Sequence, residues 1–401
     1  MLRNTFKAFQ YRDFRLLWFG ACTSTTGTWM QEIAQNWLVL EMTNSPFLLG
    51  LDAFLGDIPI FLFSLVGGVI ADRMDRRKLL VISQLIQMTS AMVLSFLIAT
   101  HRIQIWHILL SSFVVGTAQS FGGPAYSALV PSLVEKEDLP NAIALNSIQF
   151  NLARVIGPVL GGLALKYVGA AWCFGLNSLS FVAVIISLSQ LHINFKPPRT
   201  GDSIFTGMKQ GIRFIRTQGA METLVFIAFC MTALAIPMIT FLPVFVKDVF
   251  HQNEMTYTLF LVTTGLGSIT GALTVAWMGN IANKGRIALT MLMALGAGIT
   301  GFSLSNSLVA SCILLFVSGG FMMCAFAMIS SLVQLVTPND MRGRVMSVYN
   351  VAFRGGMPFG SITTGRLVPI FTAPNVLSVN GLVLLSIGAY FLFVQRKVAA
   401  L

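Results

Sequence analysis

The sequence predicts an all-α membrane protein with twelve transmembrane helices, arranged as two pseudo-symmetric six-helix bundles with both termini in the cytoplasm. Three observations lead to this prediction. Of the 401 residues, 55% are hydrophobic and only 10% are charged, whereas about a quarter of the residues in a soluble protein are charged. The apolar residues gather in runs that are long enough to cross a bilayer as helices. The cations are concentrated in alternate loops.

Each apolar run of about 18 or more residues is expected to form one membrane-spanning helix. Most gaps between the runs are only a few residues long, so consecutive helices should be antiparallel neighbours. The predicted spans are 14–40, 46–70, 79–100, 104–130, 141–168, 170–191, 222–246, 256–280, 287–304, 308–335, 343–370 and 375–395.

Most of the 26 Lys and Arg residues fall in the N-terminal tail, the C-terminal tail and every second loop. Cytoplasmic loops carry an excess of cations, so this alternation places both termini in the cytoplasm. The net charge of +11 therefore reflects membrane topology, and no nucleic-acid partner is expected. We expect a multi-pass protein of a bacterial inner (plasma) membrane.

The longest stretch between predicted spans is 192–221, and it divides the chain into two halves. It contains an amphipathic run that should lie as a helix on the cytoplasmic membrane surface. Its apolar residues at helical spacing are Ile204, Met208, Ile212 and Ile215. The expected domains are an N-terminal bundle over 1–192, a linker over 193–221 and a C-terminal bundle over 222–401.

The two halves look like an internal repeat. Asn146 to Pro158 can be aligned with the segment that lies 200 residues later, Met346 to Pro358. This alignment pairs Arg154 with Arg354. Two related halves with a substrate path between them are typical of secondary transporters.

A hairpin over 67–78 carries six charged residues between the second and third spans. It resembles the signature loop of major facilitator superfamily transporters, Gly-x-x-x-Asp-Arg-x-Gly-Arg-Arg. The matching residues are Gly68, Asp72, Arg73, Arg76 and Arg77, and Asp75 stands where the family usually has glycine. The resemblance implies the major facilitator fold and a cytoplasmic gate in which Asp72 meets the start of helix eleven, at Arg342 or Arg344. A solvated loop that only fixes topology is the alternative.

The fifth span contains Gly157-Pro158-Val159-Leu160-Gly161-Gly162, which has two interpretations. Small residues permit close helix packing, and proline bends a helix. The stretch is also similar to the antiporter motif on helix five of facilitator-family exporters, although Ala144 and Ala153 replace two earlier glycines of that motif. The similarity favours export over uptake.

Charged residues inside apolar spans are costly and usually face a cavity or a partner. Glu32 lies roughly 25 Å, Asp57 about 17 Å and Arg154 about 20 Å from the cytoplasmic ends of their spans. Either acid is thus deep enough to meet Arg154 and is a candidate for proton coupling, with structural pairing or substrate contact as alternatives. Asp52 lies near the outer mouth. Arg354 has no evident acidic partner on helices seven to twelve, which would suit an anionic substrate.

Large apolar side chains in the spans offer an adaptable lining for a substrate cavity. Packing against neighbouring helices or lipid is the alternative for each of them. The candidates are Trp29, Met30, Trp37, Phe54, Phe226, Met231, Met238 and Phe241.

Several chemistries have no support in the sequence. A Gly-x-x-x-x-Gly-Lys-Ser/Thr loop is missing, so the chain cannot hydrolyse ATP in the usual P-loop manner. No soluble segment is large enough for a catalytic domain, so we expect neither an enzyme nor a cofactor. The five cysteines lie in apolar segments without a Cys-x-x-Cys pair, which gives no disulfide framework and no metal site.

The chain resembles the enterobactin-exporter and macrolide-efflux branch of the superfamily over nearly its whole length. The segments that carry this resemblance are Asn44-Ser45-Pro46, Leu129-Val130-Pro131, Asp138-Leu139-Pro140-Asn141-Ala142 and Ala153-Arg154-Val155-Ile156-Gly157-Pro158. The resemblance implies proton-driven efflux of a drug-like or siderophore-like small molecule by alternating access. We expect a monomer whose partners are its substrate, protons and the bilayer. An uptake symporter, a lipid translocator and a non-transporting sensor or scaffold are the alternatives.

Overall fold

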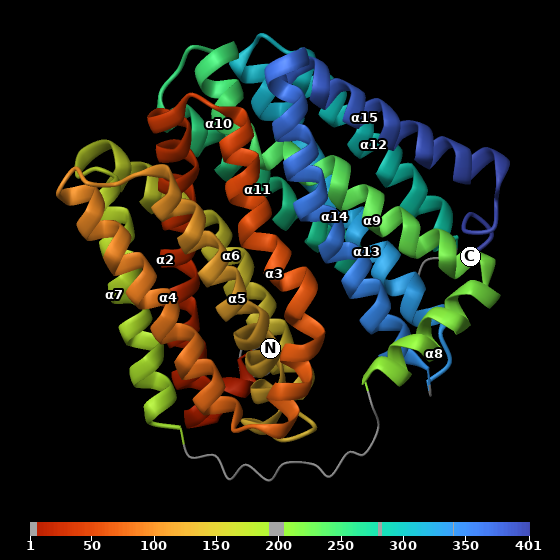
Figure 1. Cartoon of the computed structure of the whole chain (residues 1–401). Helices are drawn as coiled ribbons and strands as arrows, with labels where there is room; N and C mark the ends of the chain where they lie inside the picture. The colour runs from red at the N-terminus through yellow and green to blue at the C-terminus, as the bar shows by residue number, and fades with distance from the viewer. Residues whose placement is uncertain (1–5, 192–203, 280–282, 340) are drawn as a thin grey trace. The chain divides into compact units, whose positions relative to one another are not determined.

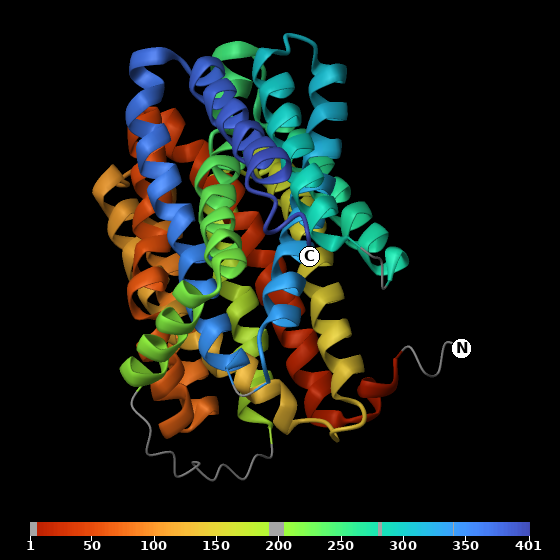
Figure 2. The ribbon, with the colours of Figure 1, turned by 90° about the vertical axis from the view of Figure 1, so that its right-hand side faces the viewer.

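A computed structural model describes residues 6–191, 204–279, 283–339 and 341–401, without the side chains of Val69, Asp72 and residues 204–207. In these ranges the chain folds almost entirely into helices and contains no strand (Figures 1 and 2). The all-α fold class is therefore confirmed for the described residues.

The helices follow the predicted spans in order. The first part of the chain forms η1 (Lys7–Gln10), α2 (Arg12–Thr43), α3 (Pro46–Arg73), α4 (Arg76–Ala99), α5 (Ile105–Leu129), η2 (Val130–Ser132), α6 (Leu139–Tyr167) and α7 (Ala170–Ser189). The second part forms α8 (Ile204–Thr217), α9 (Gly219–Thr240), α10 (Leu242–Val244), η3 (Phe245–Val249), α11 (Glu254–Met278), α12 (Lys284–Leu304), α13 (Leu308–Val336), α14 (Arg342–Phe371), α15 (Ala373–Ala389) and η4 (Tyr390–Val394).

Nine helical stretches of the described chain are long and apolar enough to cross a membrane. Three further helices, α2, α5 and α14, are also of spanning length but are not among the nine. Polar and charged residues inside these helices, such as Glu32 in α2 and Arg354 in α14, lower their apolar character. The count of twelve spans thus stays a prediction.

The chain divides into two compact units, one of Met1–Thr43 with Ile58–Thr200 and the other of Asn44–Asp57 with Gly201–Leu401. The division passes through α3, so its first turns belong with the second unit. The predicted domain boundaries stay a prediction, and residues 193–203 of the predicted linker lie outside the described residues.

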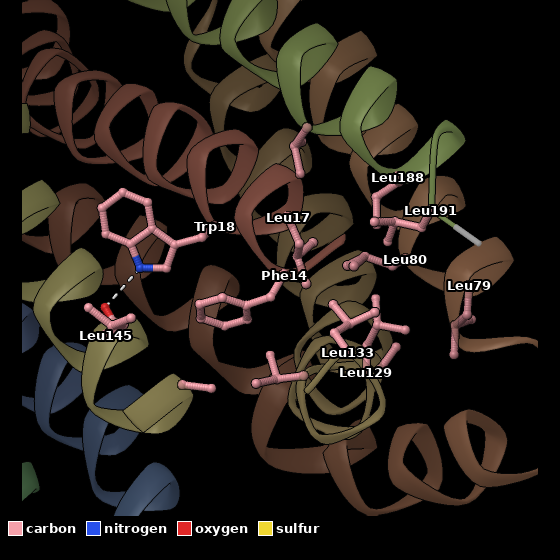
Figure 3. Packing of buried hydrophobic residues seen from close by; sticks show 14 of the residues in the cluster. Phe14, Leu17, Trp18, Leu79, Leu80, Leu129, Leu133, Leu145, Leu188 and Leu191 are labelled. Carbon is pink, nitrogen blue, oxygen red and sulfur yellow. Dashed lines mark hydrogen bonds between the residues drawn. The ribbon is translucent and has the colours of Figure 1, made fainter. Parts of the chain in front are cut away.

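One end of the first unit is filled by an apolar cluster to which η1, η2 and each of the helices α2 to α7 contribute (Figure 3). Phe14, Leu17 and Trp18 of α2 meet leucines of α4, α6 and α7 there. The Trp18 indole Nε1 donates a 2.9 Å hydrogen bond to the carbonyl oxygen of Leu145 in α6. This bond satisfies the indole N–H in an otherwise apolar contact, so the cluster fixes α2 against α6 at this end.

Glycines bring α6 close to α2. A Cβ atom at Gly157 would lie 2.9 Å from the Thr26 carbonyl oxygen, and one at Gly161 would lie 2.8 Å from the Met30 carbonyl oxygen. Both distances are too short for a side chain, so the two backbones touch along a small-x-x-x-small seam.

The second unit repeats this seam between α9 and α14. A Cβ at Gly356 would meet the Phe229 carbonyl, and one at Gly360 would meet the Ala233 carbonyl. Gly157 is therefore equivalent to Gly356, which is 199 residues later. The packing corrects the alignment by one residue, because an offset of 200 pairs Gly157 with Met357.

The amphipathic helix α8 packs against α14. Ile215 of α8 is buried, and a Cβ at Gly211 would lie 2.7 Å from the Arg344 carbonyl oxygen. Ile212 belongs to the predicted apolar stripe but is 36% exposed. Only some residues of the predicted apolar stripe are therefore buried by the contact with α14.

Candidate transport site

The Arg154 guanidinium of α6 lies over the indole of Trp29 in α2, with 5.9 Å between its central carbon and the ring centroid. Arg154 also interacts electrostatically with Glu32, which lies one helical turn beyond Trp29. A phenylalanine completes the group, since the Phe150 ring stands edge-on to Trp29 at 6.1 Å. The sequence left two acids open as neighbours of Arg154, and the structure brings Glu32 to it.

The glycine seam explains how this group forms. Trp29 sits beside Gly157, whose missing side chain lets α2 approach α6. Arg154 is three residues before Gly157, so its side chain lies on the same side of α6. Trp29 and Arg154 are half-buried, whereas Glu32 and Phe150 are exposed within their own unit. A charged pair is costly in lipid, so this face is suited to a polar pathway.

Arg354 of α14 interacts electrostatically with Asp57 of α3, and both belong to the second unit. The acidic residue near Arg354 therefore belongs to α3. Helices seven to twelve contain no evident acidic partner in the sequence. A carboxylate beside Arg354 removes the argument for an anionic substrate. Asp52, one and a half turns before Asp57, is only 3% exposed and has polar contacts of its own.

The candidate cavity residues fall into two groups. Met30, Met231, Met238 and Phe241 are buried, which fits packing between helices. Trp29, Trp37 and Phe54 are half-buried, and Phe226 is 49% exposed. The accessible aromatic residues are the ones that remain candidates for contact with a substrate.

The charged hairpin is shorter than the sequence suggested, because α3 continues to Arg73 and α4 begins at Arg76. The Asp75 carboxylate accepts hydrogen bonds from the backbone N–H groups of Arg77 and Lys78, at 3.0 and 3.4 Å. Asp75 is therefore the N-cap of α4. The aspartate that stands in place of the family's usual glycine therefore caps α4.

Two arginines of the hairpin bind the ends of other helices in the same unit. Arg76 donates to the Ala128 carbonyl near the end of α5, at 2.9 Å. Arg77 donates to the carbonyl oxygens of Leu191, at 3.2 Å, and Ser189, at the end of α7. Cations at helix C-termini satisfy orphan carbonyls and oppose the helix dipole.

The predicted gate is only partly described. The Asp72 side chain lies outside the described residues, Arg73 is exposed, and a Cβ at Gly68 would meet no atom within 4 Å. Arg342 is the first residue of α14, as predicted for the start of helix eleven. Arg344 donates to the sulfur of Met341 at 3.6 Å.

Sequence reasoning missed a polar cluster at the start of α6. Asp138 is 4% exposed and its carboxylate is bound by Lys7 at 2.7 Å, Tyr11 at 2.9 Å and Gln10 at 3.0 Å. The hydrogen bond and charge of Lys7 hold the pKa of Asp138 below its usual value, and Asp138 raises the pKa of Lys7. Asp138-Leu139-Pro140 reads as a helix N-cap, but nothing in the sequence links it to residues 7–11.

No group of three or more His, Cys, Asp or Glu side chains with metal-binding geometry occurs among the described residues.

Comparison with known proteins shows which family the chain resembles. A family model described as transmembrane secretion effector matches residues 3–400. The multidrug efflux pump Tap of Mycolicibacterium fortuitum is 25% identical over 393 residues, which is 95% of each chain. The enterobactin exporter EntS of Shigella boydii is 25% identical over 95% of this chain and 91% of its own.

Solved transporters share the fold. A peptide transporter of the POT type superposes with a TM-score of 0.78, covering 97% of this chain and 95% of its own at 13% identity. The nucleoside transporter NupG gives a TM-score of 0.72 over 97% and 99% of the two chains, also at 13% identity. The predicted resemblance to efflux transporters is confirmed: the chain belongs to the transmembrane secretion effector family of the major facilitator superfamily, a family of multi-pass membrane transporters.

Proposed function

We propose that this protein is a proton-driven exporter that works by alternating access in a bacterial inner membrane. In this proposal it is a monomer with twelve transmembrane helices, and both of its termini lie in the cytoplasm. The similarity to an efflux pump and to a siderophore exporter supports the outward direction. The substrate is a drug-like or siderophore-like small molecule.

The electrostatic interaction of Glu32 with Arg154 on the α2–α6 face carries the proton-coupling part of the proposal. A carboxylate that releases its proton beside a guanidinium gains a charge partner, and one that takes up a proton frees the cation. Alternate protonation and deprotonation of this carboxylate changes the net charge of the α2–α6 face, and the change requires no helix to move through lipid. Asp57 beside Arg354 is the second candidate for the same role.

The aromatic groups support the substrate class. Trp29 and Phe150 present partly exposed rings next to a cation and an acid. Such a surface suits a molecule with aromatic or apolar faces and a few polar groups. It gives no reason to expect a strongly anionic substrate, because each arginine has an acid nearby.

The test is uphill transport in inverted membrane vesicles. Ethidium and enterobactin serve as probes, and an uncoupler is added to half of each sample. Export from the cell appears here as accumulation inside the vesicles, and the uncoupler should abolish it. Glu32→Gln and Asp57→Asn test the two candidate acids, and Glu41→Gln at the exposed end of α2 is the matched control.

We expect at least one of the two acid variants to lose accumulation by tenfold or more while still exchanging the probe downhill. Unchanged proton-driven accumulation in both variants would exclude a proton role for these acids. Accumulation that needs right-side-out vesicles would instead indicate uptake. Transfer of a labelled phospholipid without movement of either probe would indicate a lipid translocator, and no transport of any kind would favour a sensor or scaffold.

A further inference from the structure

An apolar groove runs between α9 and α15 of the second unit. Its volume is about 460 Å³, and its lining includes Phe226 of α9 with Leu382, Val383 and Ser386 of α15. From Val379 to Tyr390 it follows α15 for roughly 16 Å, at 1.5 Å per residue. The Ser386 hydroxyl donates to the Leu382 carbonyl within its own helix at 2.8 Å, so it leaves the groove wall apolar.

The groove reaches Tyr390, where the helix type changes. α15 passes into the single π-helical turn η4 at Tyr390. This turn brings two adjacent rings to the groove, with Tyr390 edge-on to Phe391 at 5.2 Å and Phe391 edge-on to Phe226 at 6.3 Å.

Two cations follow directly after this end of the groove. Arg396 and Lys397 are exposed, and the Arg396 side chain is fixed by a 3.1 Å hydrogen bond to the Phe393 carbonyl. The Lys397 ammonium lies over the first turn of α9, where a Cβ at Gly219 would come within 2.9 Å of it. The first turn of α9 also contains an acidic residue, Glu222.

We propose that this groove binds one acyl chain of an anionic phospholipid, whose phosphate lies between Arg396 and Lys397. The apolar length, the aromatic end and the paired cations match the three regions of such a lipid in order. Basic residues at the ends of transmembrane helices recognise anionic headgroups in this way. With the C-terminus in the cytoplasm, as proposed above, the lipid belongs to the inner leaflet.

Simpler roles explain only parts of this arrangement. Cations after a helix C-terminus oppose its dipole and fix topology, but they require no groove. An apolar helix face in a membrane meets ordinary lipid, but it does not discriminate between headgroups. Selective retention of an anionic lipid distinguishes the proposed site from both.

The full-length protein, purified in detergent, is incubated with equal amounts of phosphatidylglycerol and phosphatidylcholine that carry identical acyl chains. Native mass spectrometry then counts the retained molecules of each lipid. The test variants are the pair R396Q/K397Q, which removes the cations, and V383W, which fills the groove. Their matched controls are R102Q/K166Q, two exposed cations of the other unit, and V309W at an exposed position on α13.

We expect one phosphatidylglycerol to be retained selectively, and each neutralised cation to lower that selectivity about fivefold. V383W should lose the selective lipid, and both controls should keep it. Equal retention of the two lipids by the unmodified protein overturns the proposal. Selectivity that survives in R396Q/K397Q or in V383W also overturns it. Transport of ethidium into vesicles is recorded in parallel. A failure of the lipid-binding proposal can then be distinguished from a failure of the proposed export.

Discussion

The ammonium of Lys7 lies 2.7 Å from the carboxylate of Asp138, although one belongs to the N-terminal segment and the other precedes α6. The backbone N–H of Ala8 adds a 2.9 Å hydrogen bond to the side chain of Asn141. Together these contacts dock η1 onto the start of α6. The carboxylate of Asp138 is occupied by this docking and makes no capping bond to its own helix.

The docking of η1 should weaken in acid. The pKa of Asp138 is lowered in the folded protein, so its stabilising effect is present above the unfolded value of about 3.9 and is lost as the pH falls through the lower folded value. We expect Asp138→Asn to be less stable than the unmodified protein at pH 6 and to lose less stability between pH 5 and pH 2. Thermal unfolding in detergent measures both.

Glu41→Gln is the control for this prediction, because Glu41 is an exposed acid near the end of α2. It should keep the full acid dependence of the unmodified protein. An Asp138→Asn variant with the same acid dependence as this control would show that the contact with Lys7 contributes nothing. The raised pKa of Lys7 matters at the alkaline end of the pH range. The stability that Lys7 contributes is lost only above its unfolded pKa of about 10.4.

Arg154 and Glu32 should behave as a coupled pair. Arg154→Gln leaves Glu32 without its counter-charge, so we expect transport to fall by about tenfold or more. In Arg154→Gln/Glu32→Gln neither charge remains. Its loss in the free energy of unfolding should differ by about 0.5–3 kcal/mol from the sum of the losses of the two single variants. A double-mutant cycle of thermal unfolding measures this coupling energy. Purely additive effects would mean that the two charges do not interact.

The α2–α6 seam should tolerate no added methyl group. A Cβ at Gly161 would lie 2.8 Å from the Met30 carbonyl oxygen, so Gly161→Ala should cost about 1–3 kcal/mol through overpacking. Gly123→Ala in α5 is the control, since a Cβ there would meet no atom within 4 Å. We expect the control to be neutral or slightly stabilising. Equal effects of both substitutions on the unfolding temperature would argue against close contact at the seam.

The N-cap at Asp75 gives a prediction that separates capping from gating. Asp75→Ala should cost about 1 kcal/mol of stability, and Asp75→Gly only a few tenths. Asp75→Ser should restore most of the loss, because its hydroxyl can accept the same N–H bond from Arg77. If the glycine and alanine variants are equally unstable, the carboxylate acts through something other than the cap.

Apolar run length was sufficient to predict the helices, because the bilayer sets how many residues a span needs. α4 and α5, for example, differ from the predicted 79–100 and 104–130 only by a few residues at their ends. The start of α4 moved from residue 79 to Arg76, where the side chain of Asp75 caps the helix. Run length carries no information on such contacts.

The site was harder to predict, because depth along a helix does not give the direction of a side chain. Depth allowed Arg154 to meet Asp57 or Glu32, and only the rotation of α2 and α6 decided for Glu32. The same limit applies to Met231 and Met238, which have the composition of cavity residues but lie buried. The cluster around Asp138 depends on a contact between distant segments, which periodicity cannot reveal.

The glycine seams carry a consequence for how the two halves diverged. Aligned by their seams, Arg154 corresponds to Phe353, and Arg354 corresponds to Val155. One residue along a helix is a turn of about 100°, so the cation lies on a different side of its helix in each half. A protein engineered from two copies of the first unit would therefore have its second arginine over an aromatic ring on the α2–α6 seam, and would lack any counterpart of the Asp57–Arg354 contact.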